Sequence, residues 1–517
     1  RNVGAGETLL EQSVDHRVLR LEFLFLERCA QLVDEHIRAR FLDFHHGRCP
    51  LAADLQAGVM HHALQFIDFA ARHERDSAAL FALSSIKASG LESFSLGPAR
   101  RVALNGTGWY GKSDLFRLMQ VAPTTVVGLC DVDKNQLQGA ASLIAGRSAS
   151  NANIPLYGDY RKMLAEQKPE IVLIGSPDHW HALQAIESIQ SGAHVYLQKP
   201  ISVDVLEGEA ILAAARKYNR TVQVGTQRRS TPHLMEAKKN IVDAGLLGKV
   251  HHVEMCCYFH MRSSNNPSLQ PVPDFLYYEL WTGPAPFRPY DGLPHRRWWR
   301  AFMEYGNGIM GDMCIHMFDT VRWMLDLGWP NKISSTGGIY GSNPGKSNIA
   351  DSQTAIFEYE NLNCVWQHRS WGTAADPEYP WSFKIYGENG TLCGSTLKFD
   401  FIPSGKGEKI HRDVVLEKEK YPEDLTEKDI ELFAAPATRE HMRNFLAAID
   451  NNTRPVADIE EGHISTASCI LANMAMKLQR PLVYDPVKRI VKNDREATAM
   501  LKRDYRSPWK HPHHLLS

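Results

Sequence analysis

A glycine motif between a predicted strand and a predicted helix is the strongest indication of fold in this sequence. The segment RVALNGTGWYGKSDLFRLMQ, residues 101–120, has the pattern of a short apolar strand, a Gly106-x-Gly108-x-x-Gly111 turn and a helix. A second apolar stretch, TTVVGLCDVD, reaches Asp131, 25 residues after Gly106. Strand and helix patterns keep alternating, which predicts a doubly wound parallel sheet, a Rossmann domain, over residues 100–225.

This motif predicts a dinucleotide site. Gly106 would permit the tight turn, Gly108 would let a pyrophosphate approach the backbone, and the helix N-terminus would face its negative charge. Asp131 would accept hydrogen bonds from the adenosine ribose and repel a 2′-phosphate, so we expect NAD rather than NADP. The alternative is a glycine-rich turn that binds no ligand.

Candidate proton-handling residues lie in two other segments. Lys199, in VYLQKP, follows a strand and should face the ligand crevice at the carboxyl ends of the sheet. In GNGIMGDMCIHMFD, Asp312 and His316 are four apart and would share one helix face. Imidazole could take the proton of an alcohol oxidised by a nicotinamide cofactor, with Asp312 orienting the ring. We find no further ligands at matching spacing, so no metal is expected, and Asp319 should pair structurally.

The pattern of strands and helices over residues 226–510 predicts an α+β domain with a large, open, mostly antiparallel sheet. Within it, residues 256–302 are rich in aromatic side chains, and flat rings pack well on the C–H faces of sugars. We expect most of these rings to be core or interface residues. A sugar, glycoside or cyclitol is the best substrate class, and the candidate substrate-binding residues are Lys199, Arg228, Tyr258, Trp299, Asp312 and His316.

Residues 1–99 differ in composition and predict a helical extension of unknown role, either a partner-binding or metal-binding module or a neutral extension. The net charge of −1 gives no case for a nucleic-acid partner or an anionic membrane. No apolar run approaches the ~20 residues of a membrane helix. Nine cysteines without a CxxC pair indicate a reducing compartment, so a cytoplasmic location is expected, with export by a missing leader left open because the chain starts with Arg1.

From about residue 101 to 510 the chain resembles the Gfo/Idh/MocA oxidoreductases, named for glucose–fructose oxidoreductase and inositol dehydrogenase. The resemblance rests jointly on GTGWYG, SPDHWHALQA, QKP, GNGIMGDMCIHMFD and FKIYGENGTL. Two further segments, LWTGPAPFRPYDG and DREATAMLKRDYRSPW, resemble a bacterial subgroup often encoded with polysaccharide-degrading genes. Such proteins join a Rossmann domain to an α/β domain whose open sheet often builds homodimers or homotetramers.

The resemblance implies roles for individual residues. Lys199 matches the lysine of the family's Glu-Lys-Pro motif, which hydrogen-bonds the reacting hydroxyl, while Asp312 matches the substrate-binding acid and His316 the general base. The usual Glu is Gln198 here, and losing that carboxylate could lower the pKa of Lys199. Together with the glycine motif, the resemblance implies a cofactor site formed by Gly106, Gly108, Trp109, Tyr110, Gly111, Asp131, Ser176, Pro177, His181, Gln198, Lys199 and Gln227.

Three functions remain open from the sequence. The leading one is an NAD-dependent dehydrogenase that oxidises a secondary hydroxyl of a sugar, glycoside or cyclitol to a ketone. The first alternative is a glycosidase in which NAD transiently oxidises C3, elimination cleaves the glycosidic bond, water adds, and the ketone is reduced again. The second is a non-catalytic dinucleotide-binding regulator, which ranks low because such members tend to lose the Lys199, Asp312 and His316 set.

Overall fold

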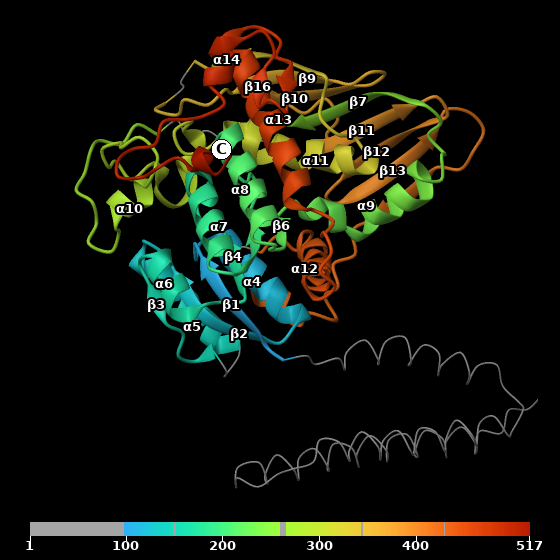
Figure 1. Cartoon of the computed structure of the whole chain (residues 1–517). Coiled ribbons are helices and arrows are strands. Elements are labelled where there is room, and N and C mark those ends of the chain that lie inside the picture. Colours follow the sequence, from blue (N-terminus) through green and yellow to red (C-terminus); the bar gives the residue numbers. More distant parts are fainter. Residues whose placement is uncertain (1–97, 148–150, 259–264, 343–344, 429, 517) are drawn as a thin grey trace, which may run out of the picture. The chain divides into compact units, whose positions relative to one another are not determined.

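The computed structural model describes residues 98–147, 151–258, 265–342, 345–428 and 430–516. Almost all of the extension expected over residues 1–99 lies outside this description. The described chain is organised around two β-sheets with helices packed on them (Figure 1).

The first sheet has six parallel strands in the order β3-β2-β1-β4-β5-β6. Its strands are β1 (Arg100–Asn105), β2 (Thr124–Cys130), β3 (Leu156–Tyr157), β4 (Ile171–Ile174), β5 (His194–Leu197) and β6 (Val222–Val224). The helices between them are α4 (Trp109–Val121), α5 (Lys134–Arg147), α6 (Tyr160–Gln167), α7 (His181–Gln190) and α8 (Val205–Lys217). The doubly wound parallel sheet expected from the sequence is confirmed.

Helices cover both faces of this sheet, so both faces are buried. Successive side chains of a strand point to opposite faces. On β1, Val102 and Leu104 belong to the apolar layer that includes Leu115 of α4. Ala103 belongs to the opposite layer, which contains residues of α6, α7 and α8 such as Ile186. The continuous apolar strands seen in the sequence are therefore explained by helices on both faces.

The second sheet has eight strands in the order β14-β13-β12-β11-β7-β10-β9-β8, antiparallel except for the parallel pair β10 and β7. The strands are β7 (Val250–Cys257), β8 (Lys332–Gly338), β9 (Ser352–Glu358), β10 (Asn363–Arg369), β11 (Trp381–Gly387), β12 (Gly390–Ser395), β13 (Lys398–Pro403) and β14 (Ile410–Asp413). The expected large, mostly antiparallel sheet is confirmed.

The helices after β6 are mostly short until the last third of the chain. They include α9 (Pro232–Ala237), the π-helix η4 (Lys238–Val242), α10 (Tyr278–Thr282), the π-helix η7 (Met310–Cys314), α11 (Ile315–Met324), α12 (Ala435–Asp450), α13 (Ile459–Leu478) and α14 (Arg495–Ala499). Short 3₁₀ turns include η2 (Asp178–Trp180), η3 (Gln227–Ser230) and η9 (Pro512–Leu516). A small sheet pairs β15 (Tyr484–Asp485) with β16 (Ile490–Val491).

The last third of the chain returns to the first sheet and ties the two sheets together. Met442 and Phe445 of α12 pack in the same apolar layer as α4. Helix α13 packs against α8 on one side and β8 on the other, which agrees with its nearly complete burial (Figure 1). Tyr505 and Trp509 then pack against the α6–α8 layer. Residues distant in sequence therefore complete the surroundings of the Rossmann sheet.

Candidate active site

The glycine turn after β1 has the geometry that a dinucleotide-binding loop needs. Gly106 has φ +82°, and an added Cβ would lie 2.4 Å from the backbone nitrogen of Ser176. A Cβ on Gly111 would lie 2.0 Å from the carbonyl oxygen of Gly106, so helix α4 can pack this closely only with glycine there. Around Gly108 nothing lies within 4 Å of an added Cβ. That open space is where a pyrophosphate would meet the backbone and the N-terminus of α4.

Asp131 follows β2 beside this turn. Its Oδ2 accepts hydrogen bonds from the backbone nitrogen of Thr107 at 2.8 Å and from the Thr107 hydroxyl at 3.0 Å. Its Oδ1 accepts one from the backbone nitrogen of Asp133, and burial raises its pKa above the usual value. A pocket of about 360 Å³ adjoins Asp131 and is lined in part by Lys134, Tyr157 and Tyr277. The glycine turn, the carboxylate and the pocket fit the adenosine half of NAD.

The other residues expected to bind the cofactor lie in two regions, one near the glycine turn and one where α4 meets the segment after β6. Trp109 is 47% exposed at the start of α4, while Ser176 and Pro177 form the loop after β4. Tyr110 donates a 2.8 Å hydrogen bond to Glu431, and the Gln227 amide lies 3.5 Å from the Tyr110 hydroxyl. These two side chains lie where α4 and the segment after β6 meet, next to the residues expected to be catalytic.

His181 and Gln198 do not fit the expectation that they contact the cofactor. The His181 ring is fully buried, and its nitrogens lie 2.7 and 2.8 Å from the backbone oxygens of Pro200 and Ser176. It therefore holds the loops after β4 and β5 together. Gln198 is 5% exposed, and its amide donates a 2.7 Å hydrogen bond to Asp114 of α4.

Asp114 explains what the Glu-to-Gln departure at position 198 does. Asp114 is 2% exposed, and burial raises its pKa to about 7. A carboxyl group already occupies the space beside residue 198, so a glutamate there would face a second acid. The sequence offered no signal for this pairing, because 84 positions separate the two residues.

Lys199 and Asp312 meet directly. The Lys199 Nζ donates to the Asp312 Oδ1 at 2.7 Å and to the Asp312 backbone oxygen at 2.8 Å. Burial lowers the pKa of Lys199, which Asp312 partly opposes. Burial alone would raise the pKa of Asp312, but Arg300 and Lys199 outweigh that effect and lower it. An ammonium has three N–H donors, so one remains for a substrate oxygen.

His316 lies near Lys199, but Asp312 is not its hydrogen-bond partner as the sequence had suggested. The ring is 4% exposed, and its Nδ1 has no hydrogen-bond partner among the described residues. Its pKa is well below the usual value because of burial first, and then because of Lys199, Arg228 and Arg300. The imidazole is therefore neutral at neutral pH and able to accept a proton.

The expectation that Asp312 orients His316 is wrong. Asp312 lies in the π-helix η7, whereas His316 belongs to α11, and the structure has no hydrogen bond between them. The wider π-turn changes the angular offset between residues four apart. Asp312 binds Lys199 and Arg300 instead, and His316 packs its ring at 5.5 Å from Trp381.

Arg300 and Asp178 complete this group and were missed in the sequence. The Arg300 guanidinium lies 3.2 Å from the Asp178 carboxylate and 3.3 Å from that of Asp312, and 4.0 Å from the Trp299 ring centroid. Trp299, which we expected to bind substrate, is 8% exposed and supports Arg300. Burial raises the pKa of Asp178 to about 7. Asp178 is part of the SPDHWH segment, but nothing local marked it as a site residue.

Tyr258 does not join these residues. It follows β7, and its hydroxyl lies 3.4 Å from Gln367, an exposed residue of β10, while Arg369 lies over its ring. Alternate β7 residues Val253, Met255 and Cys257 are buried on the other face of the sheet, in the core that includes Cys314 of η7. The expected role of Tyr258 in substrate binding is therefore not supported.

Several other sequence candidates are structural. Asp319 binds Arg229 through two hydrogen bonds of 2.7 and 2.9 Å, which confirms that it pairs structurally. Core aromatics were also expected, and the rings buried in the main core include Tyr278, Trp281, Tyr290 and Trp299.

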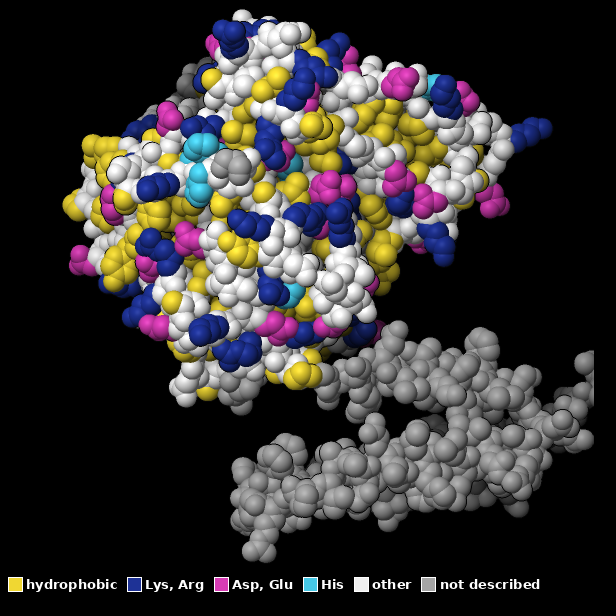
Figure 2. All heavy atoms as spheres, viewed as in Figure 1, with side chains coloured by type: hydrophobic (Ala, Val, Ile, Leu, Met, Phe, Trp, Pro, Cys, Tyr) yellow, Lys and Arg dark blue, Asp and Glu magenta, His cyan; other side chains and the backbone are white. Residues whose placement is uncertain are grey.

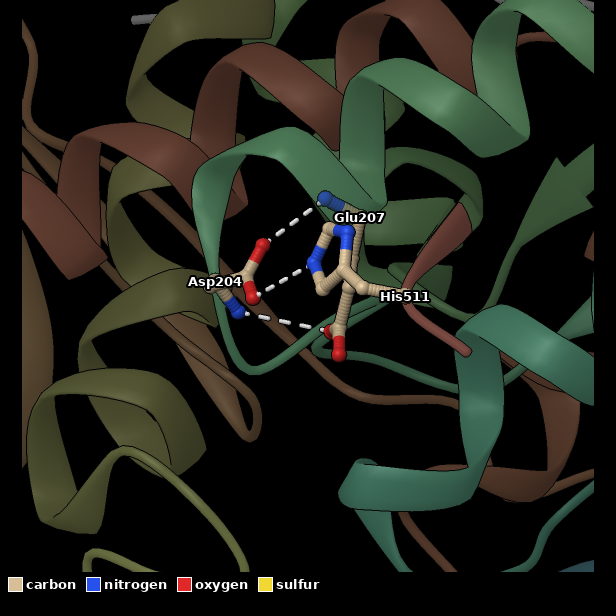
Figure 3. A group of neighbouring side chains, drawn as sticks. All are labelled: Asp204, Glu207 and His511. Atoms are coloured by element: carbon tan, nitrogen blue, oxygen red, sulfur yellow. Dashed lines mark hydrogen bonds and ion pairs between the residues drawn. The ribbon is translucent and has the colours of Figure 1, made fainter. Parts of the chain in front are cut away.

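One group of described residues has metal-ligand spacing: Asp204, Glu207 and His511 (Figure 3). Asp204 accepts from the backbone of Glu207 and lies 3.0 Å from the His511 Nε2. Glu207 accepts from the backbone of Val203 and from the Tyr505 hydroxyl. These carboxylates cap the N-terminus of α8, whose dipole disfavours a cation. The group fits a cap that fastens the C-terminal segment better than it fits a metal site.

The surface gives two further observations. On the face drawn in Figure 2, positive and negative side chains are interspersed, with no extended field of one sign. Within the described part of the chain, every helix is too short or too polar to cross a lipid bilayer.

Comparison with protein families matches three successive parts of the chain. Residues 100–226 match the NAD-binding Rossmann fold of the Gfo/Idh/MocA oxidoreductase family. Residues 235–393 match a Gfo/Idh/MocA C-terminal domain, and residues 401–511 match the C-terminal α/β domain of the same oxidoreductases.

Individual relatives agree with this assignment. An inositol 2-dehydrogenase of Salmonella typhimurium is 27% identical over 29% of this chain and 43% of its own length. A glycosyl hydrolase family 109 protein of a Shewanella species is 27% identical over 31% of this chain and 35% of its own. The chain therefore spans less than half the length of these two relatives.

A solved structure shows the same fold. The oxidoreductase from Agrobacterium radiobacter in complex with NAD⁺, L-tartaric acid and magnesium has a TM-score of 0.56 and 14% identity. The match covers 74% of this chain and 98% of that one. The three family matches, the two sheets and the glycine turn together show that this chain belongs to the Gfo/Idh/MocA family of oxidoreductases, with an NAD-binding Rossmann domain.

Proposed function

We propose that this protein oxidises a secondary hydroxyl of a sugar, glycoside or cyclitol to a ketone, with hydride transfer to NAD. The observation that carries the proposal is the buried Lys199–Asp312 pair beyond the carboxyl end of β5, with His316 close enough for the Lys199 charge to lower its pKa. Ligands of open parallel sheets bind at these strand ends, so this is where a nicotinamide and a substrate carbon would meet.

Each of the three residues has a task that its surroundings allow. Lys199 would donate its remaining N–H to the oxygen of the reacting hydroxyl. Asp312 holds the Lys199 amino group in place and partly opposes the lowering of its pKa by burial. His316, neutral because of its lowered pKa, would take the hydroxyl proton.

The reaction balances with these groups. The alcohol loses one proton to His316 and one hydride from its carbinol carbon, which leaves a ketone. Bound NAD supplies the hydride acceptor. The Asp131 carboxylate beside the ribose position supports NAD over NADP, because it would repel a 2′-phosphate.

The test is a combined cofactor and product assay. Denatured protein is examined for released NAD, and native protein is incubated with glycosides and cyclitols while NADH absorbance is followed and the products are analysed. NADH formed together with a keto-sugar supports the proposal. Loss of this activity in His316→Ala, with NAD binding retained, would tie it to the site.

A redox-neutral glycosidase is the second candidate, and the similarity to the glycosyl hydrolase family 109 protein favours keeping it. It would use the same residues. After oxidation, elimination would release the aglycone and leave an unsaturated keto-sugar, water would add across its double bond, and NADH would return the hydride to the ketone. Release of the aglycone without NADH would select this reaction over net oxidation.

We also propose that the chain forms a homodimer or homotetramer through the open face of the eight-stranded sheet. One exposed apolar side chain of this sheet is Ile402 of β13, which is 46% exposed. Light scattering on purified protein would give the mass, and a monomer would contradict the proposal.

A further inference from the structure

Arg228 is a buried cation with no ion-pair partner among the residues that the structure describes. It belongs to η3, directly after β6, and is 2% exposed. Its Nε and Nη1 atoms are buried without a hydrogen-bond partner among the described residues, and the structure gives it no ion pair there. Burial lowers its pKa, yet a guanidinium stays charged. Leaving such a charge unpaired is costly, so its position calls for a physical explanation.

The surroundings of Arg228 place it at the catalytic residues. Its guanidinium lies 5.2 Å from the Trp381 ring centroid, and the same ring lies 5.5 Å from that of His316. Phe433 covers another side at 5.7 Å. Its positive charge also contributes to the lowered pKa of His316.

The other charges of the site are already paired with one another. Lys199 contacts Asp312, and Arg300 contacts both Asp178 and Asp312. Glu431 interacts with Arg228 at a distance, but its carboxylate accepts the hydrogen bond of Tyr110. Among the described side chains of this site, Arg228 is thus the cation without a carboxylate.

We infer that Arg228 binds a carboxylate of the substrate, so the substrate is an acidic sugar such as a hexuronate or its glycoside. Planar guanidinium groups match carboxylates through paired N–H donors. One free cation matches one negative charge, which favours a carboxylate over a phosphate dianion. This inference rests on the proposed oxidoreductase function and specifies its substrate class.

The pyrophosphate of NAD is a less suitable anion for Arg228 than a substrate carboxylate. The pyrophosphate is expected at Gly108, after β1, whereas Arg228 follows β6, with β4 and β5 between these strands. At a spacing of about 4.8 Å between neighbouring strands, the two strand ends are roughly 14 Å apart. The experiment separates the two sources by measuring NAD affinity independently.

The first measurement is direct binding of carboxylates to the NAD-loaded full chain. Tryptophan fluorescence is followed during titration with acetate and with D-glucuronate, because an anion on Arg228 would lie beside the Trp381 ring. We expect a saturable change in the wild type, absent in Arg228→Gln and weakened in Arg228→Lys. Arg454→Gln, at a side chain 68% exposed, is the matched control and should behave as wild type. No saturable response to either anion in wild type overturns the inference.

The second measurement compares methyl glucuronide with methyl glucoside, and methyl galacturonide with methyl galactoside. The wild type should bind at least one acid about tenfold or more tightly than its neutral partner, since a charged hydrogen-bonded pair supplies that much affinity. Arg228→Gln should remove this preference and leave NAD affinity unchanged. Equal loss for acid and neutral sugar, no acid preference in wild type, or weakened NAD binding overturns the inference. An acid that binds through Arg228 but is not oxidised instead contradicts the proposed function alone.

Discussion

The Lys199 Nζ lies 2.7 Å from the Asp312 Oδ1, and this contact joins the Rossmann domain to the helix that follows in the second domain. The two residues are 113 positions apart, and both side chains are at most 9% exposed. Breaking a buried pair by removing one charge leaves the other uncompensated. The pair therefore couples the expected catalytic chemistry to the docking of the two sheets.

Lys199→Met should lower kcat by about a hundredfold or more, because it removes the group that meets the reacting oxygen. NAD affinity, measured by calorimetry, should change little. Lys162→Met, at a side chain 69% exposed, is the control. Wild-type turnover in Lys199→Met would refute the assigned role.

His316→Ala should abolish turnover while leaving NAD binding close to wild type. Its ring makes no hydrogen bond to the described residues through the buried Nδ1, so little polar bonding is lost. Partial recovery of rate on adding imidazole would identify the missing base. A variant that retains full activity would contradict the proposal.

The pH profile should separate Asp178 from His316. Burial raises the pKa of Asp178 to about 7, whereas that of His316 is well below its usual value. The wild-type profile of kcat/KM should therefore show an inflection near pH 7 from Asp178. As the pH rises through this value, Asp178 becomes ionised beside Arg300. Asp178→Asn should lack the inflection, and a profile that keeps it would assign it to another group.

Gln198→Glu should destabilise the protein most at high pH. The new carboxylate would face Asp114, whose pKa is already raised to about 7. Both acids ionise as the pH rises above 7, so the loss in Tm should grow there and shrink below it, where a proton can be shared. Asp114→Asn in the same chain should restore stability. Gln138→Glu, at an exposed position of α5, is the control and should change Tm little at any pH.

The two glycines of the turn should respond differently to alanine. In Gly111→Ala the Cβ would meet the Gly106 carbonyl oxygen at 2.0 Å, so Tm should fall. In Gly108→Ala the Cβ meets no protein atom within 4 Å, so Tm should stay near wild type while NAD binds more weakly. Unchanged NAD affinity in Gly108→Ala would move the pyrophosphate away from this turn.

The Rossmann domain and its cofactor turn could be predicted from the amino-acid sequence, because both depend on local patterns. Glycines at fixed spacing, an apolar strand before them and Asp131 after the next strand are all read within about thirty residues. The candidate catalytic residues could also be named, since Lys199 and His316 stand in recognisable segments, but their contacts could not be predicted.

The contacts between the side chains of the site became visible only in the folded chain. Arg300 reaches Asp178 across 122 positions, Gln198 faces Asp114, and Asp312 turns to Lys199 in place of His316. These pairings depend on how the two sheets pack and on a π-turn within a helix. A buried charged group needs a partner, and here the partners come from distant parts of the chain. Local sequence patterns therefore do not predict these contacts.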